Sequence, residues 1–287
     1  MLLDCSPNSL GLSSPTYHLK IRNQEVFLIE LVEPTMLVVL ALVAFIAGFI
    51  DAVAGGGGML TVPTLLSLGL PPHIALGTNK LAATFASSTA AFTYYRKKLF
   101  KPKYWLRAFV MTLIGATVGT LVVDAISTDW LQKVLPLIIL AAAIYTVWHK
   151  APTTVQNEMP AGCKKFNTKQ YLQGFGLGFY DGLAGPGTGA FWTVSSMALY
   201  RLNILLASGL AKAMNFTSNL TSLITFAILG HIDWVLGLTM GICLMAGAFV
   251  GAHSAIRFGA KFIRPVFVTV VSILAVKLAY DAWFVTL

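Results

Sequence analysis

Charged residues are scarce in this 287-residue sequence, and their scarcity excludes a water-soluble globule. Only 11% of the residues are Asp, Glu, Lys or Arg, whereas 56% are apolar. Soluble chains average about 25% charged residues, so too few charges are present to cover the surface of a soluble domain. The apolar content also excludes intrinsic disorder, which requires low hydrophobicity. The remaining class is a multi-pass membrane protein.

Cysteines and catalytic motifs are equally sparse. The three cysteines, Cys5, Cys163 and Cys243, are too few for a disulfide-stapled secreted domain, and their spacing fits no metal site. The sequence contains no H-E-x-x-H, Walker lysine or G-x-S-x-G motif. We therefore predict no enzyme, no catalytic residue, no cofactor and no metal. An intramembrane enzyme is the weakest alternative, because no nucleophile, base or metal set supports it.

The positive charge of the chain has two explanations. A formal net charge of +9 fits a nucleic-acid-binding protein. However, the basic residues lie in short runs between long apolar stretches, which is typical of the cytoplasmic loops of membrane proteins. We therefore expect a lipid bilayer around the protein and no nucleic acid as a partner.

Long apolar stretches divide the chain into candidate membrane segments. A straight helix needs about 20 apolar residues to cross the hydrocarbon. The stretches that meet this length are Thr35–Ala54, Ala75–Tyr95, Tyr104–Val123, Trp130–Trp148, Asn203–Leu229, Trp234–Ile256 and Arg264–Trp283. Three more, Met59–Leu70, Tyr171–Ala184 and Thr188–Tyr200, are short or interrupted by glycine. The sequence thus predicts an all-α membrane protein with about ten segments.

Loop charges predict the orientation of these segments. The basic run Arg96–Lys103 and the lysines of the linker 150–170 belong in the cytoplasm, whereas the loop Asp124–Asp129 has no basic residue and belongs outside. With ten crossings, both termini lie outside. Residues 1–33 form a polar extension without the apolar core of a signal peptide. Either a native extension or a misassigned start codon explains them.

The sequence contains an internal repeat. The run Gly48-Phe49-Ile50-Asp51 recurs as Gly178-Phe179-Tyr180-Asp181 at an offset of 130, and Lys80 recurs as Lys212 at an offset of 132. The glycine pair Gly115 and Gly119 recurs as the pair Gly247 and Gly251, also at an offset of 132. Glycine matches are common in an apolar chain, but two matched acids and two matched lysines are not.

The repeat organises the chain into two halves, 34–149 and 171–287, joined by the linker 150–170. Because the charge rule places equivalent loops on opposite sides of the membrane, the halves are predicted to be inverted five-segment repeats. Inverted repeats with short or broken helices at their interface are typical of secondary transporters, which bind substrate at that interface.

Each half breaks its first helix at a glycine-rich stretch, Gly55-Gly56-Gly57-Gly58 or Gly185-Pro186-Gly187-Thr188-Gly189. Non-helical backbone at membrane depth is stable only when it is buried in protein or lines a cavity. The segment after each break begins with amides that lack intrahelical partners, which makes an anion site from backbone. The alternative is that the glycines only let helices approach closely. We expect a cavity here and close approach at the two glycine pairs.

Polar side chains lie inside the apolar segments. An intramembrane lysine costs about 2.5 to 3.5 kcal/mol, so Lys80 and Lys212 either snorkel to the interface or serve a function, which their recurrence favours. Asn215 and Asn219 follow Lys212 on nearly one face and either line a hydrated path or bond helix to helix.

Three roles are open to Asp51 and Asp181. They neutralise the lysines, cap the short helices or carry protons. If they pair with the lysines, the empty site is near neutral, and an anion binds best when a carboxylate is protonated.

Several motifs together resemble the TauE/SafE sulfite-exporter family of membrane permeases, in its bacterial branch of unassigned substrate. They are the run Gly48–Gly58, the sequence Gly77-Thr78-Asn79-Lys80, the run Gly178–Gly182 and the stretch Lys212–Asn219. The resemblance spans residues 34–284 and implies transport of sulfite, a sulfonate or another organosulfur anion across the bacterial inner membrane. The expected substrate-binding residues are Asp51, Gly55, Gly56, Gly57, Gly58, Thr78, Asn79, Lys80, Asp181, Gly185, Gly187, Thr188, Lys212, Asn215 and Asn219.

The predicted function is therefore a small-anion transporter, with an anion channel as the first alternative. An anion that leaves a negative cell interior gains about 2.3 kcal/mol per charge for each 100 mV. An exporter can therefore run as a uniporter, whereas an importer needs a coupled proton or cation. Direction, proton coupling and oligomeric state are left open.

Overall fold

A computed structural model describes residues 34–135, 137, 164–259, 262, 265 and 269. The chain divides into a short unit, Met1–Leu40, and a large unit, Ala41–Leu287, and every contact given below lies within the large unit. The N-terminal extension 1–33 and most of the linker and of the predicted segments Trp130–Trp148 and Arg264–Trp283 lie outside the described residues.

The described residues form helices and no β-strand. The helices of the first half are α2 (Pro34–Ala54), α3 (Gly58–Ser67), α4 (Pro72–Arg96), η1 (Pro102–Trp105) and α5 (Leu106–Asp124). Those of the second half are α7 (Lys164–Leu183), α8 (Thr188–Tyr200), α9 (Ile204–Leu229) and α10 (Trp234–Phe258). The helical prediction is confirmed for this part of the chain, including the short helix after each glycine stretch. Helix α7, however, begins inside the predicted linker.

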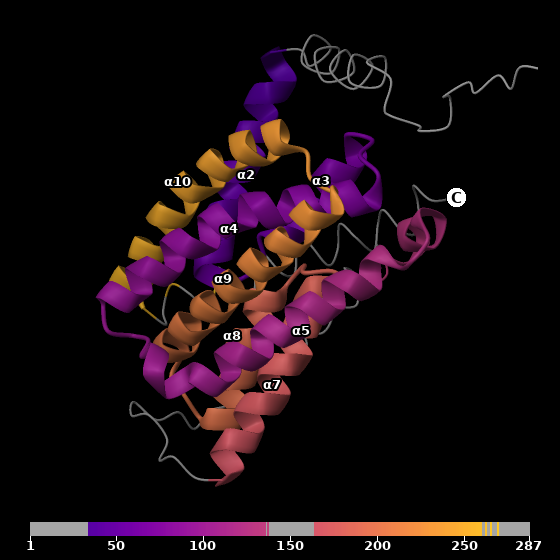
Figure 1. Ribbon diagram of the computed structural model, residues 1–287. Coiled ribbons are helices and arrows are strands. Elements are labelled where there is room, and N and C mark those ends of the chain that lie inside the picture. The colour runs from indigo at the N-terminus through magenta and orange to yellow at the C-terminus, as the bar shows by residue number, and fades with distance from the viewer. Residues whose placement is uncertain are drawn as a thin grey trace, which may run out of the picture. The chain divides into compact units, whose positions relative to one another are not determined.

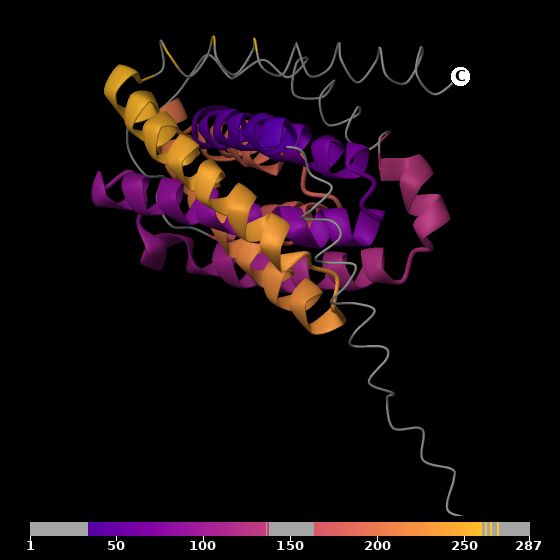
Figure 2. The ribbon, with the colours of Figure 1, turned by 90° about the horizontal axis from the view of Figure 1, so that it is seen from above.

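Helices α4 and α9 contact each other at the centre of the large unit (Figure 1). Helix α10 packs against α4, a contact that Figure 2 shows from a second direction. Helix α5 packs against α9 and also lies along α7. Each half therefore supplies a helix that covers the central helix of the other half.

Glycines permit the closest of these helix contacts. A Cβ atom on Gly115 of α5 would lie 2.4 Å from the carbonyl oxygen of Phe175 in α7, and one on Gly247 of α10 would lie 1.9 Å from that of Phe45 in α2. Phe45 and Phe175 are equivalent positions at the offset of 130. The same close contact is thus made twice, as expected for the two glycine pairs.

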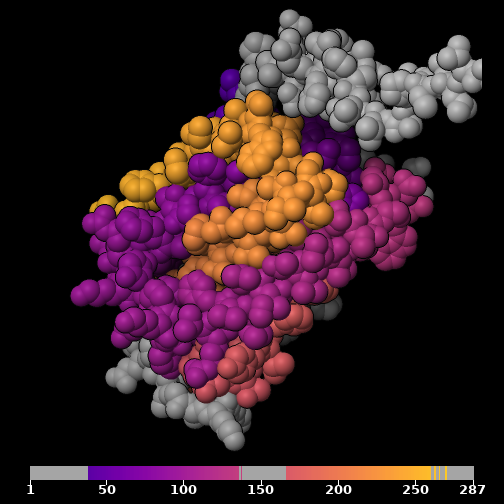
Figure 3. All heavy atoms as spheres, viewed as in Figure 1, coloured from indigo at the N-terminus to yellow at the C-terminus, as the bar shows by residue number. Residues whose placement is uncertain are grey.

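Apolar side chains lie on the outside of the large unit, and four charged side chains are buried within it. The exposed apolar residues of α5 and α10 include Leu106, Val110, Leu113, Ile114, Val118, Leu121, Trp234, Leu238, Ile242, Met245 and Phe249. Both helices lie on the face seen in Figure 3. The buried residues include two lysines and two aspartates, Lys80, Lys212, Asp51 and Asp181. Charged residues of a soluble protein are almost never buried so fully, and this distribution suits surroundings of hydrocarbon.

Two helical stretches within the described ranges are long and apolar enough to cross a membrane, judged by length and composition. They are Pro102–Asp124 and Trp234–Phe258. Helices α4 and α9 are as long, but the polar side chains on their buried faces make them less apolar. Many of the buried polar residues of the large unit therefore lie on its central helix pair.

Candidate functional site

The two predicted helix breaks have the same backbone geometry. Gly55 follows the end of α2 with a φ of +82°, and Gly185 follows the end of α7 with a φ of +90°. The amide of Gly55 donates to the carbonyl of Ile50 at 3.2 Å, and the amide of Gly185 donates to the carbonyl of Tyr180 at 3.3 Å. Both helices thus end on a residue in the left-handed region, which favours glycine. The sequence repeat is thus also a repeat of backbone conformation.

The two breaks touch each other through their backbones. The amide of Ala190, in the first turn of α8, donates to the carbonyl of Gly55 at 3.2 Å. A Cβ atom on Gly55 would lie 2.3 Å from the carbonyl carbon of Gly189, and one on Gly189 would lie 2.6 Å from the Cα of Gly55. Only glycine fits at both positions. The crossing brings the starts of α3 and α8 to the same place in the protein.

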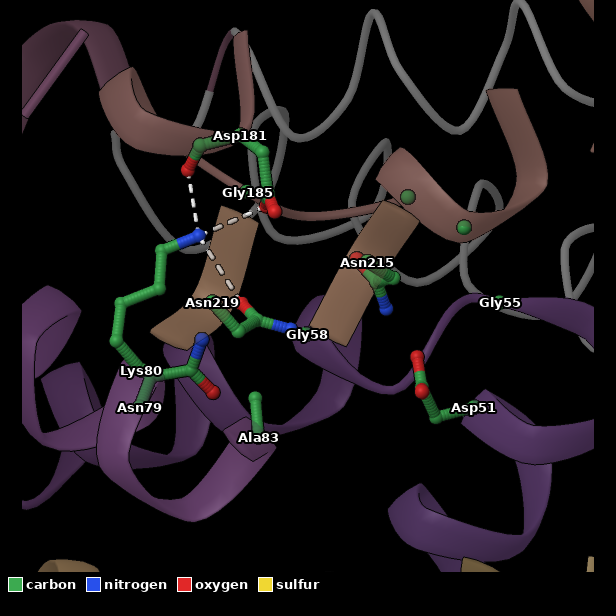
Figure 4. Close-up of a pocket in the computed structure, with 12 residues that line it drawn as sticks. Asp51, Gly55, Gly58, Asn79, Lys80, Ala83, Asp181, Gly185, Asn215 and Asn219 are labelled. Carbon is green, nitrogen blue, oxygen red and sulfur yellow. Dashed lines mark hydrogen bonds and ion pairs between the residues drawn. The ribbon is translucent and has the colours of Figure 1, made fainter. Parts of the chain in front are cut away.

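A small cavity of about 20 Å³ lies at this crossing (Figure 4). Its lining residues are Asp51, Gly55, Gly58, Asn79, Lys80, Ala83, Asp181, Gly185, Gly187, Gly189, Asn215 and Asn219. All except Ala83 and Gly189 belong to the set predicted from the sequence. The cavity is thus formed by both breaks together with α4 and α9.

Lys80 forms a buried ion pair with Asp181 of the other half. Its Nζ lies 2.7 Å from Oδ1 of Asp181 and also donates to the backbone carbonyl of Asp181 at 2.5 Å. A third contact, to Oδ1 of Asn219, measures 3.3 Å, and Figure 4 shows all three. The two paired side chains are only 1% and 2% exposed. Lys80 therefore does not snorkel, and its charge is held at the cavity.

Asp181 is bonded through both of its carboxylate oxygens. The hydroxyl of Thr188 donates to Oδ1 at 3.1 Å, and the hydroxyl of Ser218 donates to Oδ2. Together with Lys80, three side chains from three different helices hold this carboxylate. Of the three roles that the sequence left open, Asp181 takes the first and neutralises a lysine.

Lys212 and Asp51 make only part of the equivalent arrangement. The ammonium of Lys212 donates to the backbone carbonyl of Asp51, as Lys80 does to that of Asp181. The carboxylate of Asp51 instead accepts a hydrogen bond from the amide of Gly57 at 3.3 Å. No ion pair of Lys212 is found in the part of the chain that the structure describes. The lysine-to-carbonyl contact is repeated, but the lysine-to-carboxylate contact is not.

Two asparagine side chains are oriented by donors beside the cavity. The hydroxyl of Thr61 donates to Oδ1 of Asn79 at 2.5 Å, and Lys80 donates to Oδ1 of Asn219. Because each Oδ1 faces a donor, each NH₂ group is free to face an acceptor. The cavity therefore offers an ammonium, amide NH₂ groups and the starts of two helices as donors or positive ends, and the carboxylates of Asp51 and Asp181 lie beside them.

The remaining predicted residues lie beside the cavity and not on its lining. They are Gly56, Gly57, Thr78, Thr188 and Lys212. Gly57 and Thr188 bond the two aspartates, as described above. The hydroxyl of Thr78 accepts a hydrogen bond from the amide of Asp233 at 2.9 Å, so it holds the loop between α9 and α10.

Sequence reasoning missed three residues at this site. Ala83 is the repeat equivalent of Asn215 at the offset of 132, so the repeat itself could have indicated it. Gly189 belongs to the second glycine stretch, and its role becomes visible only from the crossing with Gly55. Nothing in the sequence singles out Thr61.

Comparison with known proteins gives consistent matches over most of the chain. A family model described as "Sulfite exporter TauE/SafE" matches residues 40–278. "Probable membrane transporter protein ORF9" of Sinorhizobium sp is 37% identical over 86% of this chain and 93% of its own length. A "Probable membrane transporter protein" of Haemophilus influenzae is 36% identical over 87% and 97%, and "Probable membrane transporter protein YfcA" of Escherichia coli K12 is 34% identical over 88% and 93%. No solved structure matches the chain.

Proposed function

Since the chain belongs to the TauE/SafE family of sulfite exporters, we propose that it is a multi-pass membrane transporter that moves a small anion through the central cavity. One observation carries the proposal: Lys80, the amides of Asn79 and Asn219 and the starts of α3 and α8 surround one buried cavity. An oxyanion accepts hydrogen bonds and favours helix N-termini. Sulfite, a sulfonate or another organosulfur anion matches this set of donors.

The two halves are, in this proposal, inverted five-segment repeats that together cross the inner membrane about ten times, with both termini outside. Three equivalences support a repeat: the helix ends at Gly55 and Gly185, the glycine contacts of α5 and α10, and the lysine-to-carbonyl bonds. Inverted repeats place the substrate where their broken helices meet.

The proposed binding step is a competition for Lys80. In the empty site, Asp181 neutralises the ammonium. An entering anion shares this ammonium with Asp181 and accepts hydrogen bonds from the NH₂ groups of Asn79 and Asn219. The two halves then rock about the crossing of Gly55 and Gly189, which opens the cavity to one side of the membrane at a time. No covalent bond changes, so the anion leaves as it entered.

Anion flux into proteoliposomes tests the proposal. The panel is sulfite, thiosulfate, sulfoacetate, sulfate and simple carboxylates, each measured with and without a pH gradient. We expect saturable uptake and counterflow of at least one sulfur oxyanion, recovered unmodified. Lys80→Ala should abolish this uptake, whereas a purely structural role of Lys80 would leave it unchanged. A folded wild-type protein that moves none of the panel overturns the proposal.

An anion channel is the alternative that the same donors would serve. A channel conducts down a gradient without saturation and cannot drive counterflow of a labelled anion. Absence of counterflow, with flux proportional to concentration, would therefore replace the transporter with the channel.

A further inference from the structure

The two aspartates of the cavity stand at equivalent positions but differ in their hydrogen bonds. The carboxylate of Asp181 accepts from three side chains, those of Lys80, Thr188 and Ser218. The carboxylate of Asp51 has a single recorded donor within the described ranges, the amide of Gly57 at 3.3 Å. Figure 4 shows Asp51 across the cavity from the bonded pair. One carboxylate is therefore satisfied, and the other is open to the cavity.

The sequence accounts for this difference. Thr188 corresponds to Gly58 at the offset of 130, and Ser218 corresponds to Ala86 at the offset of 132. Neither Gly58 nor Ala86 has a side chain that can donate. The carboxylate of Asp51 thus lacks hydroxyl donors because the first half has glycine and alanine at these two positions. A different rotamer of Asp51 would not supply the missing hydroxyls.

The charges around Asp51 decide what its carboxylate does to a bound anion. Lys80 of α4 and Asp181 of α7 face it across the cavity as a neutral pair. Lys212 of α9 bonds its backbone carbonyl, and the Lys212 ammonium attracts the Asp51 carboxylate without a direct hydrogen bond among the described contacts. Helix α3 and the first turns of α8 carry no titratable side chain, and α10 packs on α2 through glycines. An anion in the cavity is therefore repelled by the carboxylate of Asp51, and one proton on that carboxylate removes the repulsion and adds an O–H donor.

We propose that Asp51, and not Asp181, binds a proton together with the transported anion. The inference rests on the proposed function, because it names the coupled ion of the same cavity. One proton joins the carboxylate of Asp51 for each anion that enters, and both leave on the other side. Transport of a monovalent anion with one proton moves no net charge.

Proteoliposomes loaded with methanesulfonate or sulfate test the coupling, because these anions keep a fixed charge between about pH 5.5 and 8. We expect wild-type uptake to rise as the external pH falls, by at most about tenfold per pH unit for one titrating site. An inward proton gradient should drive accumulation above equilibrium. Asp51→Asn should lose accumulation and give a flat pH profile for the counterflow that it retains. Asp124→Asn is the matched control, because it makes the same exchange at a carboxylate that is 31% exposed and outside the cavity lining, and it should leave accumulation in place.

A second variant decides the case if Asp51→Asn loses counterflow. Ala86→Ser adds a hydroxyl at the position equivalent to Ser218, where it can donate to the charged carboxylate of Asp51. The pH of half-maximal uptake should then move down, on the order of one pH unit. An unchanged profile in Ala86→Ser overturns the inference, as does full accumulation by Asp51→Asn.

Two further outcomes separate this inference from the proposed function. A wild-type protein that transports the anions without any response to a pH gradient overturns the proton coupling and leaves the anion transporter intact. A wild-type protein that transports no anion of the panel overturns both.

Discussion

Lys80 and Lys212 are repeat equivalents, each only 1% exposed, yet they are neutralised differently. Each bonds the backbone carbonyl of an aspartate in the other half, but only Lys80 also reaches a carboxylate. The backbone contact follows from the shared path of the two broken helices. The carboxylate of Asp181 also accepts from the hydroxyls of Thr188 and Ser218, whose equivalents in the first half, Gly58 and Ala86, carry none. The comparison teaches that the backbone repeat has kept its geometry while its side chains have taken different roles at one cavity.

The largest expected effect comes from exchanging the two carboxylates for amides. Asp181→Asn leaves the ammonium of Lys80 buried without a counterion, and breaking a buried pair from one side costs about 3–5 kcal/mol. Asp51→Asn changes a carboxylate with one recorded donor and should cost about 1 kcal/mol. Thermal unfolding of both variants in detergent measures the difference. Equal losses of stability in the two variants would mean that the two aspartates contribute equally to the folded state.

A second large effect is expected at the crossing of the breaks. Gly55→Ala places a methyl group 2.3 Å from the backbone of Gly189 at a φ of +82°, so we expect a loss of at least about 2 kcal/mol. In Gly56→Ala the nearest atom, Cγ2 of Ile50, lies 3.8 Å away, and the change should stay within about 0.5 kcal/mol. Yield and monodispersity in size-exclusion chromatography, followed by thermal unfolding, test both.

The matched variant in the other half sharpens this test. A Cβ atom on Gly189 would lie 2.6 Å from the Cα of Gly55, so Gly189→Ala should be as damaging as Gly55→Ala. A tolerated Gly189→Ala, or a damaging Gly56→Ala, would show that the glycines serve something other than this crossing.

Much of the architecture could be predicted because it depends on local signals. Apolar length located the described helices, and the glycine stretches located both breaks. The start of α7 could not be found this way, because hydropathy ignores polar residues that find partners. Gln170 is buried, and its Oε1 accepts a hydrogen bond from the amide of Ala108 at 3.3 Å. A segment that reads as a polar linker is therefore part of a packed helix.

The site could be predicted only as a set of residues. The repeat identified two lysines and two aspartates, but an offset in sequence gives no partner in space. Lys80 pairs with the carboxylate of Asp181, which lies 101 positions away. Lys212, in contrast, donates to the backbone carbonyl of Asp51 and not to its carboxylate. These choices depend on how α4, α7 and α9 pack. They also depend on Ser218 and Thr188, whose hydroxyls point at one carboxylate only after folding.

A third effect, of intermediate size, tests whether the two halves pack alike. Gly115→Ala and Gly247→Ala each place a methyl group against a backbone carbonyl, 2.4 and 1.9 Å from the oxygen. Overpacking of this kind costs about 1–3 kcal/mol, and we expect similar losses of stability from both variants.

Gly176→Ala is the control for this pair, because nothing lies within 4 Å of its added Cβ atom in α7. Alanine is the better helix former by about 1 kcal/mol, so this variant should be slightly more stable than the wild type in the same unfolding experiment. A large difference between Gly115→Ala and Gly247→Ala would show that only one half needs the close contact.

The smallest effect is expected at the loop between α9 and α10. Nε2 of His231 lies 2.7 Å from Oδ1 of Asp124, but both side chains are 31% exposed. Exposed pairs contribute about 0–1 kcal/mol. The equivalent positions in the other half, Leu99 and Ile256 at the offset of 132, carry no charge. The pair is therefore a second place where the halves differ in side chains.

The backbone beneath this pair is nevertheless repeated. A Cβ atom on Gly77 would lie 1.9 Å from the carbonyl of His231, and one on Gly209 would lie 2.7 Å from the carbonyl of Leu99. His231→Leu places at the Gly77 contact the residue type that Leu99 has at the Gly209 contact. We expect the free energy of unfolding to fall by less than about 1 kcal/mol. A loss comparable to that of Asp181→Asn would mean that exposed pairs at the ends of the helices, and not the buried pair, hold the two halves together.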